Sequence, residues 1–112
     1  MLKCGGQVTF EERGDCVIVR IGGEIDHHGA VSVRTGIDRW LSGKRPPKVY
    51  LELSGVQFMD SSGLGLIMGR YALVKRYEGA LAVLDPSPAV ERIIQLAGLE
   101  RMVPVLKSKK KG

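Results

Sequence analysis

The stretch Phe58-Met59-Asp60-Ser61-Ser62-Gly63-Leu64-Gly65 is the part of the sequence around which the predicted fold is organised. Before it, residues 48–53 alternate apolar and polar side chains, which is typical of a half-buried β-strand. After it, residues 62–78 carry apolar side chains at helical spacing, which predicts an amphipathic helix. The predicted buried stripe of this helix is Leu64, Ile67, Met68, Tyr71 and Val74. One aspartate and two adjacent serines therefore stand where a strand passes into a helix.

The N-terminal part of the chain predicts a β-hairpin followed by a helix. The hairpin strands are expected at residues 8–12 and 16–21, because a Gly-Asp turn separates two runs of strand-forming side chains. We expect a loop over residues 22–29 and then a helix over residues 30–42, ended by Gly43. The predicted inward face of that helix is Ala30, Val33, Ile37, Trp40 and Leu41.

The C-terminal part predicts a strand, a helix and a short last strand. The strand is expected at residues 80–84 and the last one at residues 102–106. Ser87 is the predicted N-cap of the helix, with Pro88 at its first position and Gly98 after its end. The predicted inward face of this helix is Val90, Ile93, Ile94 and Ala97. The whole order, ββαβαβα(β), predicts one α/β domain with a mixed, mostly parallel sheet and an N-terminal antiparallel hairpin.

Length and composition indicate a small soluble domain. A chain of 112 residues can build one ordinary core without a metal or a disulfide. We expect this domain over residues 1–106 and a basic, flexible tail over residues 107–112. No apolar run reaches the roughly 18 residues of a membrane span, and the N-terminus lacks the apolar core of an export signal. We therefore expect a cytoplasmic protein that does not contact membranes and whose thiols, Cys4 and Cys16, are reduced.

The net charge of +5 comes mostly from the C-terminal end. Four of the 17 basic residues lie there, which leaves 13 basic against 12 acidic residues elsewhere. These four are Lys107, Lys109, Lys110 and Lys111. We interpret this end as a solvated tail and predict no direct contact with nucleic acid. The alternative is a weak, salt-sensitive contact with an acidic partner or a nucleic acid.

Ser61 and Ser62 stand at the predicted start of a helix, where free backbone N–H groups and the helix dipole favour negative charge. A phosphate on a serine there would be tolerated. The structural alternative is an ordinary helix cap. However, three candidate caps stand in a row, and Gly63 and Gly65 would let another surface approach the backbone closely. We therefore predict a regulatory phosphorylation site at Ser61.

A second polar segment, Glu24-Ile25-Asp26-His27-His28, follows another predicted strand. Because the carboxyl ends of parallel strands meet at one edge of a sheet, we expect Asp26 to lie near Asp60. In the alternative, Asp26 only caps the first helix. The chain has two histidines, and no set of side chains is seen to converge on them, so we predict no metal site.

The sequence does not indicate nucleotide binding or catalysis. Gly63-Leu64-Gly65 lacks both the Gly-Lys-Ser/Thr of a P-loop and the third glycine of a dinucleotide motif. No nucleophile is accompanied by an identifiable base and orienting group. We predict no catalytic residues.

Three stretches of the chain resemble STAS domains, the fold of anti-sigma factor antagonists, and within these the sporulation branch. They are Gly23-Glu24-Ile25-Asp26-His27-His28, the stretch from Phe58 to Gly65 running on to Gly69-Arg70-Tyr71, and Ser87-Pro88-Ala89-Val90 with Gly98-Leu99. The resemblance covers residues 8–105, and its middle stretch is specific for antagonist STAS domains.

The resemblance implies a partner-switching cycle. The unphosphorylated chain would bind an anti-sigma factor that is also a serine kinase, and thereby release a sporulation sigma factor. The kinase would then phosphorylate Ser61, and a PP2C-type phosphatase would remove the phosphate. ATP and magnesium would belong to the kinase, so this chain would need no cofactor. The predicted partner-binding residues are Glu24, Asp26, Asp60, Ser61, Ser62, Gly63 and Gly65.

Other functions stay open at this point. The chain could be a STAS module of another pathway, such as stress signalling, or a STAS domain that binds a small ligand or lipid near Ser61. An enzyme is the least supported class. Ser62 is the rival phosphate acceptor, and we otherwise expect it to cap the helix or to support Ser61.

Overall fold

The structure, a computed structural model, describes residues 7–108. The elements are β1 (Gln7–Arg13), β2 (Cys16–Ile25), α1 (His27–Lys44), β3 (Lys48–Met59), α2 (Ser61–Arg76), β4 (Ala80–Leu84), α3 (Pro88–Ala97), a 3-10 turn (Leu99–Arg101) and β5 (Val105–Leu106). The predicted order ββαβαβα(β) is confirmed.

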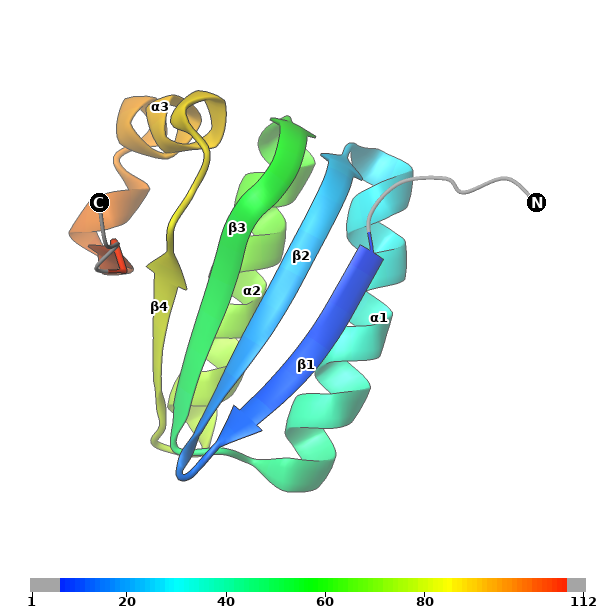
Figure 1. The fold of residues 1–112 in the computed structure, drawn as a ribbon, viewed down its shortest axis with the longest axis vertical. Coiled ribbons are helices and arrows are strands. Elements are labelled where there is room, and N and C mark those ends of the chain that lie inside the picture. The colour runs from blue at the N-terminus through cyan, green and yellow to red at the C-terminus, as the bar shows by residue number, and fades with distance from the viewer. Residues whose placement is uncertain (1–6, 109–112) are drawn as a thin grey trace.

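The strands form one five-stranded sheet in the order β1-β2-β3-β4-β5. β1 runs antiparallel to β2, and the other neighbouring pairs are parallel, as predicted. Figure 1 shows α1 and α2 side by side on one face of this sheet, with α3 at one end of it. Since α1 follows β2 and α2 follows β3, both helices begin at the same edge of the sheet. This topology brings together the polar segments that follow β2 and β3, which contain Asp26 and Asp60.

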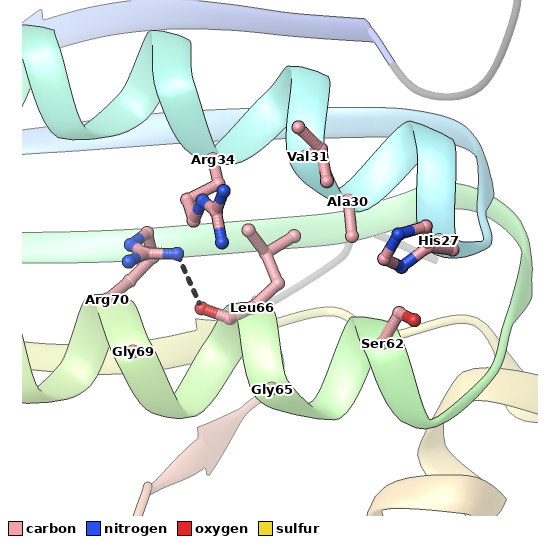
Figure 2. A pocket seen from close by; sticks show the side chains of 9 residues that line it. All are labelled: His27, Ala30, Val31, Arg34, Ser62, Gly65, Leu66, Gly69 and Arg70. Carbon is pink, nitrogen blue, oxygen red and sulfur yellow. Dashed lines mark hydrogen bonds between the residues drawn. The ribbon is translucent and has the colours of Figure 1, made fainter.

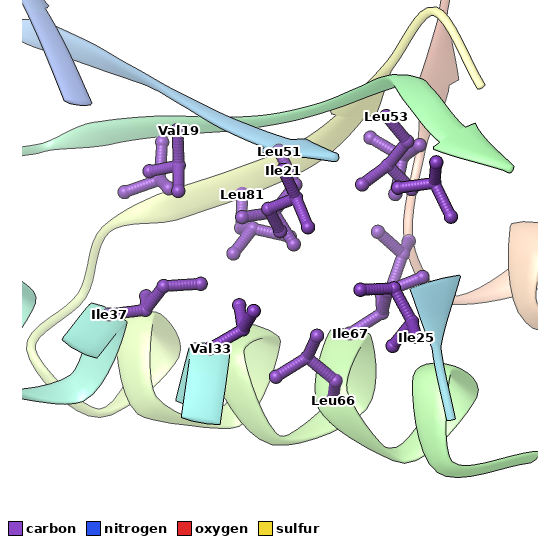
Figure 3. Packing of buried hydrophobic residues seen from close by; sticks show 14 of the residues in the cluster. Val19, Ile21, Ile25, Val33, Ile37, Leu51, Leu53, Leu66, Ile67 and Leu81 are labelled. Carbon is purple, nitrogen blue, oxygen red and sulfur yellow. The ribbon is translucent and has the colours of Figure 1, made fainter. Parts of the chain in front are cut away.

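The hydrophobic core lies between the sheet and the helices α1 and α2. Alternate side chains of the central strands point into it, because successive side chains of a strand face opposite ways. Figure 3 shows these residues packed against the helices: from the strands Val19, Ile21, Leu51, Leu53 and Leu81, and from the helices Val33, Ile37, Leu66 and Ile67. Each fully buried aliphatic side chain of this kind contributes roughly 1.5–3 kcal/mol.

The predicted loop over residues 22–29 is wrong, because β2 continues to Ile25 and α1 begins at His27. The glycines there do not end the strand. They accommodate register shifts against β3, where Gly22 lies opposite Gly55 and Gly23 has a φ of +88°. In the same way β3 extends to residue 59, beyond the predicted end at residue 53. Both central strands therefore run further toward the edge where the helices begin.

The helix boundaries and faces also differ in detail from the predictions. Gly43 does not end α1, which continues to Lys44. Pro46 follows two residues later, and because proline has no backbone N–H it could not donate the hydrogen bond that a longer helix would need there. Trp40 is only half-buried and stacks on Phe10 of β1, with 4.8 Å between ring centroids.

The predicted buried stripe of α2 is partly wrong. Met68 is 45% exposed, whereas Arg70 is only 7% exposed. α2 also ends at Arg76, two residues before the predicted end, and Leu64 and Tyr71 are half-buried at the edge of the core. The helix is rotated so that a cation, and not a thioether, faces α1.

The third helix starts at Pro88 as predicted, but Ser87 is not its side-chain cap. Instead the Ser87 hydroxyl donates to the carbonyl oxygen of Val56 at 3.0 Å, which ties the start of α3 to β3. Ala97 is exposed, contrary to its predicted inward position, and the last strand is limited to two residues.

Two sequence predictions fall partly outside the described residues. Cys4 and residues 109–112 lie there, whereas Cys16 is a free, half-buried cysteine. At the start of the predicted tail, Lys107 Nζ lies 3.1 Å from Glu91 Oε1. The Ser108 backbone N–H donates to Asp85 Oδ1 at 2.8 Å.

Candidate functional site

The ends of β2 and β3 bring the two predicted polar segments together. Ile25 lies opposite Met59 in the parallel register, and the backbone N–H of Asp60 donates to the carbonyl oxygen of Ile25 at 3.4 Å. Asp26 and Asp60 each follow directly after one of these paired residues. The expected neighbourhood of the Asp26 and Asp60 segments is therefore confirmed.

Each of the two aspartates caps a helix. Asp26 Oδ1 accepts from the backbone N–H of Gly29 at 2.9 Å, and Asp60 Oδ1 accepts from the backbone N–H of Ser62 at 2.8 Å. Both aspartates have the extended backbone of an N-cap residue and are half-buried. Both aspartates thus cap a helix, and the caps leave open whether their negative charges also contact a partner.

Ser61 is the first residue of α2 and is exposed to solvent. Its hydroxyl forms no hydrogen bond with any of the described residues 7–108. Since Asp60 provides the cap, Ser62 does not cap the helix, and its expected support of Ser61 stays a prediction. Ser62 is half-buried and lines the space between α1 and α2. Of the two serines, Ser61 is the more accessible to another protein.

The two glycines in the first turns of α2 have different surroundings. A Cβ atom at Gly63 would lie 2.2 Å from Cγ and 2.8 Å from Sδ of the buried Met59. Packing inside the domain therefore requires glycine at position 63. This reason differs from the predicted one, the close approach of a partner to the backbone. A Cβ at Gly65 would meet nothing within 4 Å, and Gly65 is exposed. Of these two glycines, Gly65 is the one that leaves open space at the surface.

The surface formed by Asp26, Asp60, Ser61 and Ser62 continues into a groove of about 340 Å³, which begins at Ser62 and runs between α1 and α2. Figure 2 shows its walls, to which α1 contributes His27, Val31 and Arg34, and α2 contributes Ser62, Gly65 and Arg70. His27 and Ser62 lie at one end, and the two arginines lie toward the other.

Sequence reasoning missed several residues of this surface. Phe58, the next-to-last residue of β3, is 49% exposed close to the Asp60 cap. Neither Arg34 nor Arg70 is among the predicted partner-binding residues. The sequence does hold a signal for Arg34. It follows Ala30 by four residues, so the two side chains lie on the same face of α1, and Ala30 belongs to the predicted inward face. Glu24, near the end of β2, is exposed as a partner contact requires.

The described part of the chain holds no group of three or more His, Cys, Asp or Glu side chains that could bind a metal ion. Within residues 7–108, no helix has the length and apolar character needed to cross a membrane. The local chemistry of the surface is that of exposed polar and charged side chains around two helix N-termini.

Comparison with known proteins identifies the family. A family model described as the STAS domain matches residues 7–111. An anti-sigma F factor antagonist from Paenibacillus polymyxa is 39% identical over 99 residues, which cover 88% of this chain and 85% of that protein. An anti-sigma-B factor antagonist from Bacillus subtilis is 26% identical over 98 residues, 88% of each chain.

A similar fold has been solved for the anti-sigma factor antagonist SpoIIAA. Its unphosphorylated form matches with a TM-score of 0.78 and 28% identity, covering 93% of this chain and 90% of that chain. Its phosphorylated form, described as a Bacillus cell fate determinant, matches with a TM-score of 0.71 and 27% identity over 93% of both chains. The chain described above therefore belongs to the STAS-domain family, among the anti-sigma factor antagonists.

Proposed function

We propose that this chain is a sporulation anti-sigma factor antagonist whose binding to a kinase is switched off by phosphorylation of Ser61. The observation that carries the proposal is the position of Ser61, exposed at the start of α2 and next to the Asp60 cap. In its unphosphorylated form the chain binds an anti-sigma factor with serine kinase activity and releases a sigma factor. A PP2C-type phosphatase resets it, and ATP and magnesium are bound by the kinase.

The comparisons support the sporulation pathway over stress signalling. Identity is higher to the relative named for sigma F than to the one named for sigma B. The existence of SpoIIAA structures in unphosphorylated and phosphorylated forms supports control by phosphate in this chain as well. Such a cycle takes place in the cytoplasm, where sigma factors act.

The electrostatics of the surface support a switch in binding. A phosphoserine adds about −1.5 to −2 charges at neutral pH. At Ser61 this charge joins Asp60, and Asp26 lies at the neighbouring strand end. A partner surface that docks here must remove water from all of these charges, and each 1.4 kcal/mol lost weakens binding about tenfold. Since the helix N-terminus favours negative charge, the domain itself need not rearrange.

The test is phosphorylation followed by mass mapping. The chain is incubated with ATP, magnesium and a sporulation-type anti-sigma kinase, and intact mass is measured before peptide fragmentation. We expect one phosphate on Ser61, loss of the complex, no phosphate on Ser61→Ala, and unchanged modification of Ser62→Ala. Phosphate on Ser62 would overturn the site. Tight binding without phosphate would keep the antagonist and remove the switch.

A second measurement separates binding from folding. Ser61→Asp should bind the kinase far more weakly than the wild-type chain while its circular dichroism spectrum stays the same. A large loss of secondary structure in Ser61→Asp would contradict the proposal, because the switch would then act through unfolding.

A further inference from the structure

The groove between α1 and α2 ends in two arginines that the proposed switch does not use. Arg70 lies two turns of α2 beyond Ser62, or about 12 Å at 1.5 Å per residue. Figure 2 shows the guanidinium groups of Arg34 and Arg70 directed toward the same part of the groove from opposite helices. No carboxylate is among the residues that line it.

Arg70 is a buried cation with incomplete compensation. Its residue is only 7% exposed, and its Nε lies 2.8 Å from Asp38 Oδ1 on α1. This contact is an ion pair without good hydrogen-bond geometry, since neither Arg70 Nε nor Asp38 Oδ1 is satisfied as a hydrogen-bonding atom. The remaining bonds are long: 3.4 Å from Nη2 to Asp38 Oδ2 and 3.3 Å from Nη1 to the carbonyl oxygen of Leu66. A buried charge is costly unless it is well paired.

Arg34 adds a second positive charge beside it. Burial lowers the pKa of Arg70, and the nearby charges act in opposite directions, Asp38 raising that pKa and Arg34 lowering it. The two guanidinium groups therefore repel each other across the groove. An anion placed between them would interact favourably with both, and Arg guanidinium groups are well suited to bind carboxylates.

We propose that this groove receives an acidic side chain of the protein partner, a carboxylate that contacts Arg34 and Arg70. This inference rests on the proposed function, because it assigns a contact to the same partner. The groove starts at Ser62 and so continues the surface around Ser61. The exposed Val31 and the open space over Gly65 suit a side chain carried on a folded surface.

The charges along this surface set the order of basic and acidic groups expected on the partner. The Asp26 and Asp60 end of the site is negative, whereas the Arg34 and Arg70 end keeps an excess of positive charge, because its two arginines stand against the single carboxylate of Asp38. A complementary partner carries a basic group opposite the aspartates and an acidic group about two helical turns away. This arrangement fixes the direction in which the partner docks, because the reversed orientation brings like charges together.

The experiment compares two charge reversals on α1. Arg34→Glu alters the groove, and Arg39→Glu makes the same change at an exposed position of α1 that does not line it. Binding of both variants and of the wild-type chain to a sporulation-type anti-sigma factor is measured by calorimetry at two salt concentrations. Arg34→Glu should weaken binding by about tenfold or more, which is 1.4 kcal/mol or more. Arg39→Glu should stay within about twofold of wild type, as isolated exposed charges contribute little.

A reciprocal substitution identifies the partner group. Replacing acidic residues of the anti-sigma factor one at a time with arginine should yield one variant that restores tight binding to Arg34→Glu. If the two α1 variants bind alike while the wild-type chain binds tightly, the groove proposal is overturned and the proposed function stands. If the wild-type chain does not bind, the proposed function and this inference fail together.

Discussion

Two glycines on the same helix should respond in opposite ways to substitution by alanine. Gly63 is buried against Met59, whereas Gly65 is exposed with nothing within 4 Å of an added Cβ. The substitutions Gly63→Ala and Gly65→Ala therefore add the same methyl group to α2 in two different environments. Because the chemical change is the same, the difference in the free energy of unfolding between the two variants reports the surroundings of positions 63 and 65.

The magnitudes follow from the contacts. At Gly63 the new methyl would lie 2.2, 2.8 and 3.0 Å from the Met59 atoms Cγ, Sδ and Cε, where ordinary contacts lie at 3.4–4 Å. Overpacking of a core costs about 1–3 kcal/mol, and the better helix propensity of alanine returns about 1 kcal/mol. Gly63→Ala should therefore destabilise the domain by up to about 2 kcal/mol. Gly65→Ala meets no obstacle and should stabilise it by about 0.5–1 kcal/mol.

Urea unfolding followed by far-UV circular dichroism measures both effects. The midpoint of Gly63→Ala should fall and that of Gly65→Ala should rise, with the same slope for both. A double-mutant cycle with Met59→Ala tests the cause, because Gly63→Ala should cost little once the Met59 side chain is gone. The reasoning is refuted if Gly63→Ala is as stable as Gly65→Ala, or if its cost is the same with and without the Met59 side chain.

Three further outcomes are expected. Asp60→Ala should lose about 1 kcal/mol of stability in urea unfolding by removing the α2 cap, and Asp60→Asn should lose only a few tenths. Ser87→Ala should lose about 1 kcal/mol through its hydrogen bond to Val56, and no loss would show that this bond is not needed. Arg20 holds the pKa of Glu11 below its ordinary value of 4.5, so the stability it adds is present above pH 4.5 and is lost as the pH falls through the lowered pKa. Unfolding curves of Glu11→Gln measured across this range should therefore depend less on pH than those of the wild-type chain.

The fold could be predicted from periodicity because each central strand and helix buries one face. The errors fall where glycine is used for something other than ending an element. Gly22 and Gly23 predict a loop, yet they let β2 keep pairing with β3 through two register shifts. A sequence does not reveal whether a glycine breaks a strand or adapts it, because the answer depends on the neighbouring strand.

The location of the candidate site could be predicted from the sequence, but the role of each residue in it could not. The rule that parallel strands end at one edge brought Asp26 and Asp60 together correctly. That rule could not show that Gly63 is needed by Met59, nor that Arg70 turns toward α1 and Met68 toward solvent. These facts depend on how α2 is rotated against the sheet, and helical spacing fixes that rotation only to within one or two positions.

The helix caps bear on how the proposed phosphorylation of Ser61 would act on binding without acting on folding. If the Ser61 hydroxyl capped α2, its modification would remove the cap and couple the switch to the stability of the helix. Asp60 takes this role, and Ser61 has no hydrogen-bond partner among the described residues, so its hydroxyl is free to be modified. The helix dipole favours an added anion by about 0.3–1 kcal/mol, while the Asp60 carboxylate opposes it. These two effects act in opposite directions within the domain, whereas a docked partner would have to accommodate the whole added charge.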